Sequence, residues 1–144
     1  MKKPKKQNLK SSWLLIVIGL VLIIFAGYFL LKPASTQVSA LPSEVSVADA
    51  VKLRDAGAFV LDVRQPEEWE QGHIPGATLI PLGDLQARSH EVPKDAKVLV
   101  VCRSGNRSQQ GRQILLAAGF TQVTSMAGGV TQWQSEGNPV VSGP

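Results

Sequence analysis

Short apolar runs alternate with polar, amphipathic stretches over residues 44–144. The run at 97–102, "KVLVVC", is apolar almost throughout, which is typical of a strand covered on both faces. Similar short runs predict three more strands, at 58–63, 77–82 and 122–126. The chain therefore contains at least four strands separated by stretches long enough to hold helices.

The stretches between these strands carry helix signals. Ser46, with Asp49 three positions later, is typical of a helix N-terminus, and Gly57 and Gly119 come where helices should end. The predicted helices cover residues 46–57, 65–72, 83–88 and 108–118. Strands and helices that alternate in this way predict an α/β fold with a mostly parallel central sheet flanked by helices.

The N-terminal region has a different pattern. Residues 13–31 contain no charged side chain, and as a helix they would span about 28 Å, close to the ~30 Å hydrocarbon core of a bilayer. Residues 1–12 contain five lysines, whereas Lys32 alone follows the apolar stretch closely. The positive-inside rule then predicts a cytoplasmic tail at 1–12, a transmembrane helix at 13–31, a linker at 32–43 and a globular domain at 44–144 outside the cytoplasm. The expected location is the inner membrane, with one pass and the domain in the periplasm.

A cleaved signal peptide is the alternative for the same region. "VSA" at 38–40 is an acceptable small-residue cleavage site, and cleavage near Ala40 would release a secreted domain. The apolar region of a signal peptide usually covers only about 7–15 residues, so the length of this stretch favours the uncleaved anchor. Both alternatives place the domain outside the cytoplasm.

The net charge of the chain, +4, is positive only because of the N-terminal region. Six of the fifteen Lys and Arg lie in residues 1–40, which contain no acid, so nine remain against eleven Asp and Glu, a net charge of −2. A mildly acidic domain gives no electrostatic support for nucleic-acid binding.

The only cysteine, Cys102, lies where the strand predicted from the run at 97–102 ends, before the helix that follows it. Ligands of open α/β sheets bind beyond the carboxyl ends of the strands. The sequence after Cys102 must turn tightly, and Gly105 and Asn106 are the residues that best tolerate a positive φ. Such a turn directs backbone N–H groups inward at a helix N-terminus, which favours a bound anion and an ionised thiol.

The side chains of this turn add further donors. We expect Cys102 to be the nucleophile, because the polar, glycine-containing sequence after it does not favour an inert buried thiol. The candidate substrate-binding residues are Arg103, Ser104, Gly105, Asn106, Arg107 and Ser108. Their hydroxyl and guanidinium groups are suited to an anionic substrate.

The loop "CRSGNRS" at 102–108 resembles the active-site loop of rhodanese-like sulfurtransferases, Cys-x-x-Gly-x-Arg-Ser. The segments "LDVRQPEEWEQGHIPGATLIPL" and "MAGGVTQW" are similar to family sequences before and after that loop, so the resemblance covers about residues 44–140. It implies a single rhodanese domain with a central parallel sheet flanked by helices. It also implies that Cys102 becomes a persulfide.

The implied reaction needs no cofactor. The Cys102 thiolate attacks the sulfane sulfur of a donor such as thiosulfate, sulfite leaves, and an acceptor such as cyanide or a thiol removes the sulfur. Because the chain has no second cysteine, the acceptor must be a separate molecule. A small sulfur-donor anion and a thiol are therefore the expected partners.

Two other functions remain open. The domain could carry a persulfide for a protein partner without turnover, or it could be a cysteine-dependent phosphatase. Related phosphatases have five residues between the cysteine and arginine of the loop, whereas four lie between Cys102 and Arg107. The tighter loop favours one extra sulfur over a phosphoryl group.

Several residues also have structural interpretations. Arg107 either contacts the substrate or pairs with a carboxylate such as Asp62 or Glu70, which would then support the loop. His73 in "GHIPGA" is better explained as a structural histidine at a turn than as a general base. Trp69 and Trp133 should pack in the core, and the glycines 128 and 129 should permit a tight turn near the site.

Overall fold

The computed structural model describes residues 17–22, 25 and 40–143. The predicted tail at 1–12 and most of the predicted linker at 32–43 lie outside these residues. Of the predicted membrane helix at 13–31, only 17–22 and 25 are described, and they are helical. Within the described part of the chain, no helix combines the length and apolar character needed to cross a membrane.

The domain contains a parallel five-stranded sheet in the order β1-β5-β4-β2-β3. The strands are β1 (Glu44–Val45), β2 (Phe59–Asp62), β3 (Thr78–Leu79), β4 (Val98–Val101) and β5 (Val123–Met126). The helices are α2 (Val47–Asp55), α3 (Pro66–Glu70), α4 (Leu85–Arg88), the 3-10 turn η1 (Ser89–Glu91), α5 (Asn106–Ala117) and α6 (Gly129–Ser135). The predicted α/β architecture with a parallel sheet is therefore confirmed.

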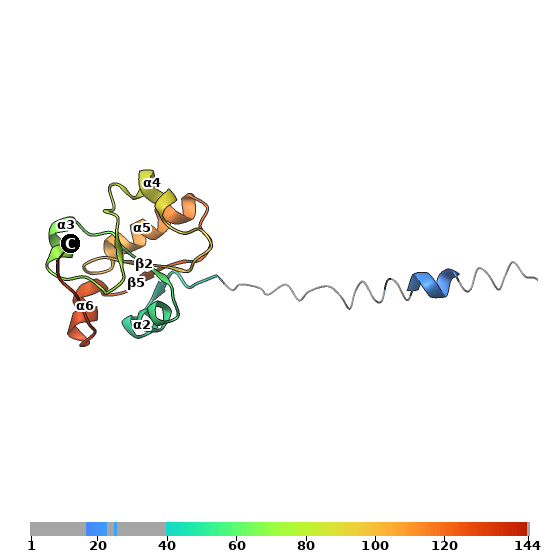
Figure 1. Cartoon of the computed structure of the whole chain (residues 1–144), viewed down its shortest axis with the longest axis horizontal. Helices are drawn as coiled ribbons and strands as arrows, with labels where there is room; N and C mark the ends of the chain where they lie inside the picture. The colour runs from blue at the N-terminus through green and yellow to red at the C-terminus, as the bar shows by residue number, and fades with distance from the viewer. Residues whose placement is uncertain (1–16, 23–24, 26–39, 144) are drawn as a thin grey trace, which may run out of the picture. The chain divides into compact units, whose positions relative to one another are not determined.

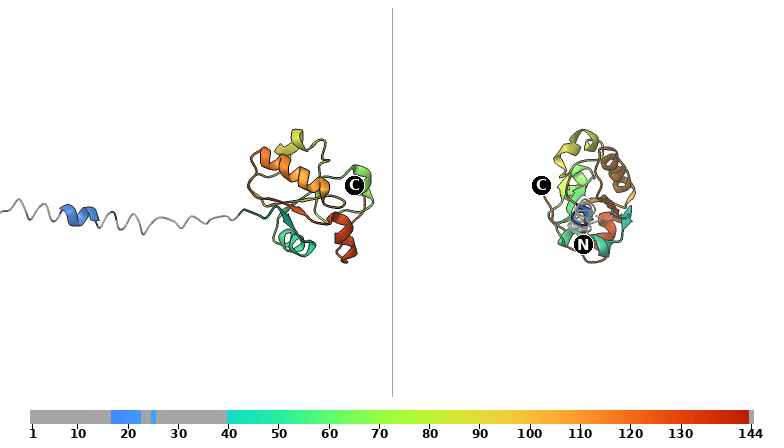
Figure 2. Two further views of the ribbon diagram at one scale, coloured as in Figure 1. Left: turned by 180° about the vertical axis from the view of Figure 1, so that it is seen from behind. Right: turned by 90° about the vertical axis from the view of Figure 1, so that its right-hand side faces the viewer.

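Helices cover both faces of the sheet (Figures 1 and 2). α4 and α5 lie on one face, and α2 and α6 lie on the other. The alternation of side chains along β4 divides its four buried residues between the two faces, with Val98 and Val100 on the α5 side and Leu99 and Val101 on the α6 side. This two-sided burial is the reason that β4 is apolar throughout.

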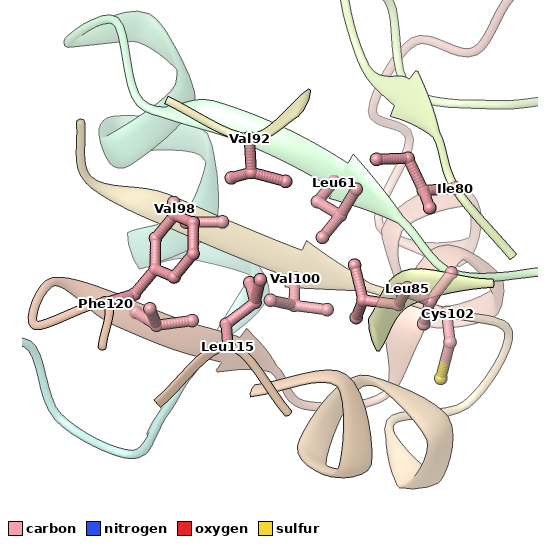
Figure 3. Close-up of a cluster of buried hydrophobic side chains, with 11 residues drawn as sticks. Leu61, Ile80, Leu85, Val92, Val98, Val100, Cys102, Leu115 and Phe120 are labelled. Atoms are coloured by element: carbon pink, nitrogen blue, oxygen red, sulfur yellow. The ribbon is translucent and has the colours of Figure 1, made fainter. Parts of the chain in front are cut away.

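The core on the α5 side extends to the end of β4 (Figure 3). Leu61, Val100, Leu115 and other apolar side chains fill it, and Cys102 lies at its end, with the sulfur at the edge of the cluster. Cys102 continues the alternation of Val98 and Val100, so its side chain lies on the same face of the sheet as α5. The position of the thiol is therefore set by the register of the central strand.

The elements differ from the expected ones mainly at their ends. The helix predicted at 108–118 begins at Asn106, because Gly105 adopts a left-handed conformation (φ 107°) and starts the helix directly after the turn. The run predicted as a strand at 77–82 forms only β3 at Thr78–Leu79, since Pro81 cannot donate to a ladder. Helix α6 and the two-residue strand β1 were not expected from the sequence.

Candidate active site

Cys102 immediately follows β4, at the carboxyl end of the sheet's central strand. Its side chain is 1% exposed, so the apolar core holds the thiol in a fixed position below the turn. It is free rather than bonded to another cysteine. The reactivity of a cysteine depends on how far nearby donors and positive charge favour its thiolate, so the groups around Sγ decide what this thiol can do.

The turn after Cys102 brings hydrogen-bond donors toward the sulfur. The Gly105 N–H donates to Sγ over 3.1 Å, and Sγ lies 3.7 Å from the Oγ of Ser108. Ser108 is fully buried, and its hydroxyl donates to the Gly105 carbonyl over 2.7 Å. The N–H groups of the first turn of α5 have no carbonyl available within the helix, so they can also serve an anion at this end.

Helix α6 holds the other side of the turn. The Val130 N–H donates to the Cys102 carbonyl over 2.8 Å, and the Thr131 N–H donates to the Arg103 carbonyl over 3.1 Å. A trans peptide places its N–H opposite its C=O, so these bonds direct the N–H groups of Arg103 and Ser104 away from α6, toward the α5 side. These two backbone N–H groups are therefore on the same side of the turn as Sγ.

Gly129 makes this contact possible. A Cβ at this position would overlap the carbonyl oxygen of Cys102 and the backbone of Arg103, and the φ of 59° also favours glycine. Gly128 has a φ of 68°, so both glycines form the turn expected from the sequence. The close approach of Gly129 to the backbone of the cysteine loop was not expected from the sequence.

Arg107 points to α3 and forms an ion pair with Glu68. Its Nη1 and Nη2 donate to the two carboxylate oxygens, each over 2.7 Å. The hydrogen bonds from Arg107 lower the pKa of Glu68 from its ordinary 4.5 to about 2, and the same bonds raise the pKa of Arg107. Glu68 also accepts from the backbone N–H of Gln65, at the start of α3, over 3.2 Å. The arginine of the loop thus connects α5 to α3.

The carboxylate partner of Arg107 differs from the two that the sequence suggested. Asp62 is fully buried and pairs with Arg64, whose Nη2 lies 2.7 Å from Oδ2. Glu70 is exposed, and its backbone carbonyl accepts from the N–H of Gly143. Glu68 makes the contact because it occupies the third position of α3, on the side that faces the loop, while Asp62 is already neutralised.

Arg64 explains how α3 is held in place. Besides its pair with Asp62, it donates to the carbonyls of Glu68 and Gly72, over 3.1 and 2.9 Å. A series of contacts therefore connects Asp62 to the loop: its pair with Arg64, the bonds from Arg64 to α3, and the ion pair of Glu68 with Arg107. The sequence could have indicated this pair, because Arg64 follows Asp62 by two positions at the end of a strand. Side chains two positions apart in a strand lie on the same face.

The remaining loop side chains are exposed. Arg103, Ser104 and Asn106 all point to solvent. Arg103 also lines a pocket of about 300 Å³ between the loop, α3 and α6. These residues are accessible to a ligand, whereas Cys102, Gly105 and Ser108 form the buried base of the loop.

The contacts of His73 are those of a residue that stabilises the fold. Its ring stacks on Trp69 with a centroid distance of 3.5 Å and an interplanar angle of 6°, and Nδ1 lies 3.1 Å from the Trp69 carbonyl oxygen. Its backbone pairs with Val141 near the C-terminus. Trp133 is fully buried in the core on the α6 side, as expected. In the described residues, no group of three or more His, Cys, Asp or Glu side chains could hold a metal ion.

Comparisons with known proteins agree with this architecture. The chain is 38% identical over 91 residues to thiosulfate sulfurtransferase GlpE of Pseudomonas entomophila, an alignment that covers 63% of this chain and 84% of GlpE. It is 34% identical over 103 residues to the "Putative sulfur carrier protein YrkF" of Bacillus subtilis, covering 69% of this chain. The matched region spans only about half of YrkF, 55% of its length.

A solved structure has the same fold. The rhodanese-related protein of Thermoplasma volcanium superposes with a TM-score of 0.65 at 33% sequence identity, covering 69% of this chain and 98% of that one. Residues 46–136 match the rhodanese-like domain family, and they include the cysteine loop and every element from α2 to α6. The chain therefore belongs to the rhodanese-like domain family.

Proposed function

We propose that the protein is a rhodanese-type sulfurtransferase that moves a sulfane sulfur from thiosulfate, or a similar donor, to a thiophilic acceptor through a persulfide of Cys102. The observation that carries this proposal is the hydrogen bond of 3.1 Å from the Gly105 N–H to Sγ. A thiolate that forms at this position meets a backbone donor directed at it, at a helix N-terminus.

In the first half-reaction the Cys102 thiolate attacks the outer sulfur of thiosulfate. A bond forms between Sγ and that sulfur, the bond from that sulfur to the sulfonate group breaks, and sulfite leaves with the electron pair. The product is Cys102–S–S⁻. Its outer sulfur lies within reach of the loop N–H groups that the bonds from α6 direct toward the α5 side. In the second half-reaction cyanide or a thiolate attacks the outer sulfur, and Cys102 leaves as a thiolate.

The position of Arg107 argues against phosphatase chemistry. A phosphoryl group in a cysteine loop needs the loop arginine for its oxygens. Here both terminal nitrogens of Arg107 are directed at Glu68, so the guanidinium does not face the centre of the loop. The relationship to thiosulfate sulfurtransferase GlpE supports sulfur transfer as well.

A persulfide carrier without turnover is the second candidate. The 1% exposure of Cys102 and the relationship to YrkF, which is named as a sulfur carrier, support it. Sulfur transfer from thiosulfate to cyanide by the purified chain, followed as thiocyanate release, distinguishes the two. We expect multiple turnovers, none with Cys102→Ser, and one added sulfur mass on the wild-type chain. A single stoichiometric transfer would identify a carrier, and phosphate release from aryl phosphates without a sulfur adduct would contradict both.

For the location, we propose that residues 13–31 anchor the chain in the inner membrane, with residues 1–12 in the cytoplasm and the domain in the periplasm. The uncharged stretch and the lysines before it support this proposal. A reporter that is active only outside the cytoplasm, fused after residue 144, should be active, and the protein should stay with membranes through alkaline washing. A soluble fragment that begins at Leu41 would favour the cleaved signal peptide instead.

A further inference from the structure

Residues 138–143, the C-terminal segment, connect α6 to the end of α3. The match to the family ends at residue 136, before this segment. In Figure 1 the end of the segment lies beside α3. Both helices contact the cysteine loop, because α6 donates to two carbonyls of the loop and α3 pairs with Arg107. The C-terminal segment therefore joins the two helices that hold the loop.

The first part of the C-terminal segment is attached to α6 through Trp133. The backbone N–H and the side-chain amide of Asn138 both donate to the Trp133 carbonyl over 3.2 Å. The indole N–H of Trp133 donates to the Pro139 carbonyl over 2.9 Å. Trp133 is fully buried, and Val140 packs against the same core cluster. This part of the segment is thus fixed to the core on the α6 side.

The second part of the segment is attached to α3 and to the residues directly after it. Val141 and His73 exchange two backbone hydrogen bonds, of 2.9 and 2.8 Å. The Gly143 N–H donates to the Glu70 carbonyl, the last residue of α3, over 3.2 Å. The side chain of Val141 is 45% exposed, so this attachment depends on the backbone bonds rather than on the side chain.

The backbone after α3 also lies close to the segment. A Cβ at Gly72 would lie 3.7 Å from Cγ2 of Val140 and 3.3 Å from the side-chain amide of Gln134 on α6. The Gly72 carbonyl accepts from Arg64 over 2.9 Å, on the inner side of α3. The end of α3 is therefore held between Arg64 and the C-terminal segment.

Helix α3 needs this support because it is short. It has five residues, and a helix of that length gains little stability from its own hydrogen bonds. Its residue Glu68 makes the two contacts of 2.7 Å with Arg107. Hydrogen bonds weaken at distances above about 3.2 Å, so a shift of α3 by about an ångström would break this pair.

We propose that the C-terminal segment positions the cysteine loop, and that Val141 is a positioning residue for sulfur transfer through its backbone bonds with His73. The segment holds α3 next to α6, which keeps Glu68 within reach of Arg107. This inference rests on the proposed function where the rate of persulfide formation is measured, whereas hydrogen exchange of the loop does not depend on that function.

Two substitutions of Val141 separate the backbone bonds from the side chain. Val141→Pro removes the N–H that donates to the His73 carbonyl, and Val141→Ala keeps that N–H. In single-turnover reactions of the full chain with excess thiosulfate, Val141→Pro should form the persulfide about threefold to tenfold more slowly, the effect of one or two hydrogen bonds. Val141→Ala should stay within about twofold of the wild type, as expected for an exposed side chain.

A double variant tests whether the effect passes through the ion pair. Val141→Pro combined with Glu68→Gln should be no slower than the slower single variant, because both disturb the same pair. Gly57→Ala is the control for a general loss of stability. It strains the backbone at the end of α2, where φ is 87° and nothing lies within 4 Å of the added Cβ. While it remains folded, its rate should stay within about twofold of the wild type.

Hydrogen exchange of the full chain, followed by mass spectrometry, measures the displacement without any sulfur transfer. In Val141→Pro, peptides that cover residues 66–72 and 102–108 should exchange at least about fivefold faster than in the wild type, because these short elements exchange through local opening. Peptides that cover α2 should not change. Gly57→Ala should give the opposite result, with faster exchange in α2 and unchanged exchange in the loop.

The failure of the proposed function and the failure of this inference give different results. If thiosulfate loads no sulfur onto the wild-type chain, the proposed function is wrong, and the exchange of residues 102–108 still decides the positioning role. Unchanged exchange of α3 and the loop in folded Val141→Pro would overturn the inference. Equal slowing by Val141→Ala and Val141→Pro would overturn it as well.

A milder variant covers the case in which Val141→Pro does not fold. A chain that ends after residue 142 loses the bond from Gly143 to Glu70 and keeps both bonds between Val141 and His73. It should show faster exchange at 66–72 and 102–108, by about twofold to threefold. Exchange at the wild-type rate in both peptides of this shortened chain would contradict the positioning role.

Discussion

The two terminal nitrogens of Arg107 lie 2.7 Å from the two carboxylate oxygens of Glu68, which connects the cysteine loop to α3. The residues are 39 positions apart in the sequence. A two-point contact between planar groups fixes orientation as well as distance. The pair therefore fixes the orientation of the Arg107 side chain, and both of its terminal nitrogens are used by Glu68.

Removing this contact should slow the reaction without ending it. Glu68→Gln keeps the size of the side chain but removes its charge, so the loop becomes less ordered and persulfide formation should slow about threefold to tenfold. Arg107→Ala should have a similar effect, and the double variant should be no slower than either single one, since both lose the same contact. Stopped-flow measurement of persulfide formation checks this. Additive losses would mean that Arg107 also acts on the substrate.

The same pair predicts a pH dependence of stability. The pKa of Glu68 is lowered from 4.5 to about 2 in the folded protein, mainly by the hydrogen bonds from Arg107. A lowered pKa means that the contribution to stability is fully present above pH 4.5 and is lost as the pH falls toward 2. We expect about 1 kcal/mol, a discounted value because 26% of the Glu68 side chain still faces solvent.

Urea unfolding of the wild type and of Glu68→Gln measures this contribution. The difference in the free energy of unfolding should be constant from pH 7 to about pH 5 and should shrink below pH 4.5. A difference that stays constant down to pH 3 would show that the charge of Glu68 does not stabilise the fold.

Gly129 should be the position where a methyl group is most harmful to the loop. Gly129→Ala adds a Cβ that overlaps the carbonyl of Cys102 and the backbone of Arg103. Gly137→Ala is the matched control, because its φ of 79° is also left-handed but nothing lies within 4 Å of the added Cβ. The control should cost about 1–2 kcal/mol from backbone strain, and Gly129→Ala should cost roughly 2 kcal/mol more.

The activity of these variants distinguishes local from global damage. If Gly129→Ala folds, it should form the persulfide at least tenfold more slowly than Gly137→Ala, because the carbonyl of Cys102 can no longer meet the N–H of Val130. If it does not fold, the unfolding of Gly129→Ala beside a folded Gly137→Ala supports the same overlap. Equal stability and activity of both variants would contradict the contact.

The sequence predicted the features that depend on local pattern. The apolar run that became β4, the cap formed by Ser46 and the turn at Gly105 each follow from the periodicity or conformational preference of a few adjacent residues. The ligand position at the carboxyl end of the sheet follows from the topology. These features were enough to place Cys102 and its donors.

The features that the sequence did not predict depend on pairs far apart in the chain. Glu68 and Arg107 meet only because α3 and α5 pack at the same end of the sheet, and several carboxylates were equally good candidates. The contact between Gly129 and the carbonyl of Cys102 is a backbone approach, which leaves no signal beyond the glycine itself. α6 has only seven residues, too few to show a helical period.

A variant of His73 tests whether this histidine takes part in the chemistry. His73→Phe keeps an aromatic ring for the stack on Trp69 but removes both nitrogens. The hydrogen bond with the Trp69 carbonyl, 3.1 Å in length, is then lost, so stability should fall by about 1 kcal/mol. The rate of persulfide formation should stay within twofold at every pH between 5.5 and 8. If His73→Phe instead removes a pH-dependent change in this rate that the wild type shows, His73 acts as a general base.

Ser108 provides the sharpest test of the loop itself. Its hydroxyl lies 3.7 Å from Sγ and donates to the Gly105 carbonyl, so it both borders Sγ and holds the glycine whose N–H donates to Sγ. Ser108→Ala should slow persulfide formation about fivefold, as expected for one hydrogen bond. Ser104→Ala is the control, because that hydroxyl is exposed in the same loop. It should change the rate less than twofold.

Each rate constant is measured from the appearance of the added sulfur mass under single-turnover conditions, with excess thiosulfate. Equal rates for Ser108→Ala and the wild type would mean that the hydrogen bond from Gly105 alone holds the ionised sulfur. Equal losses in both variants would instead point to a general effect of loop polarity.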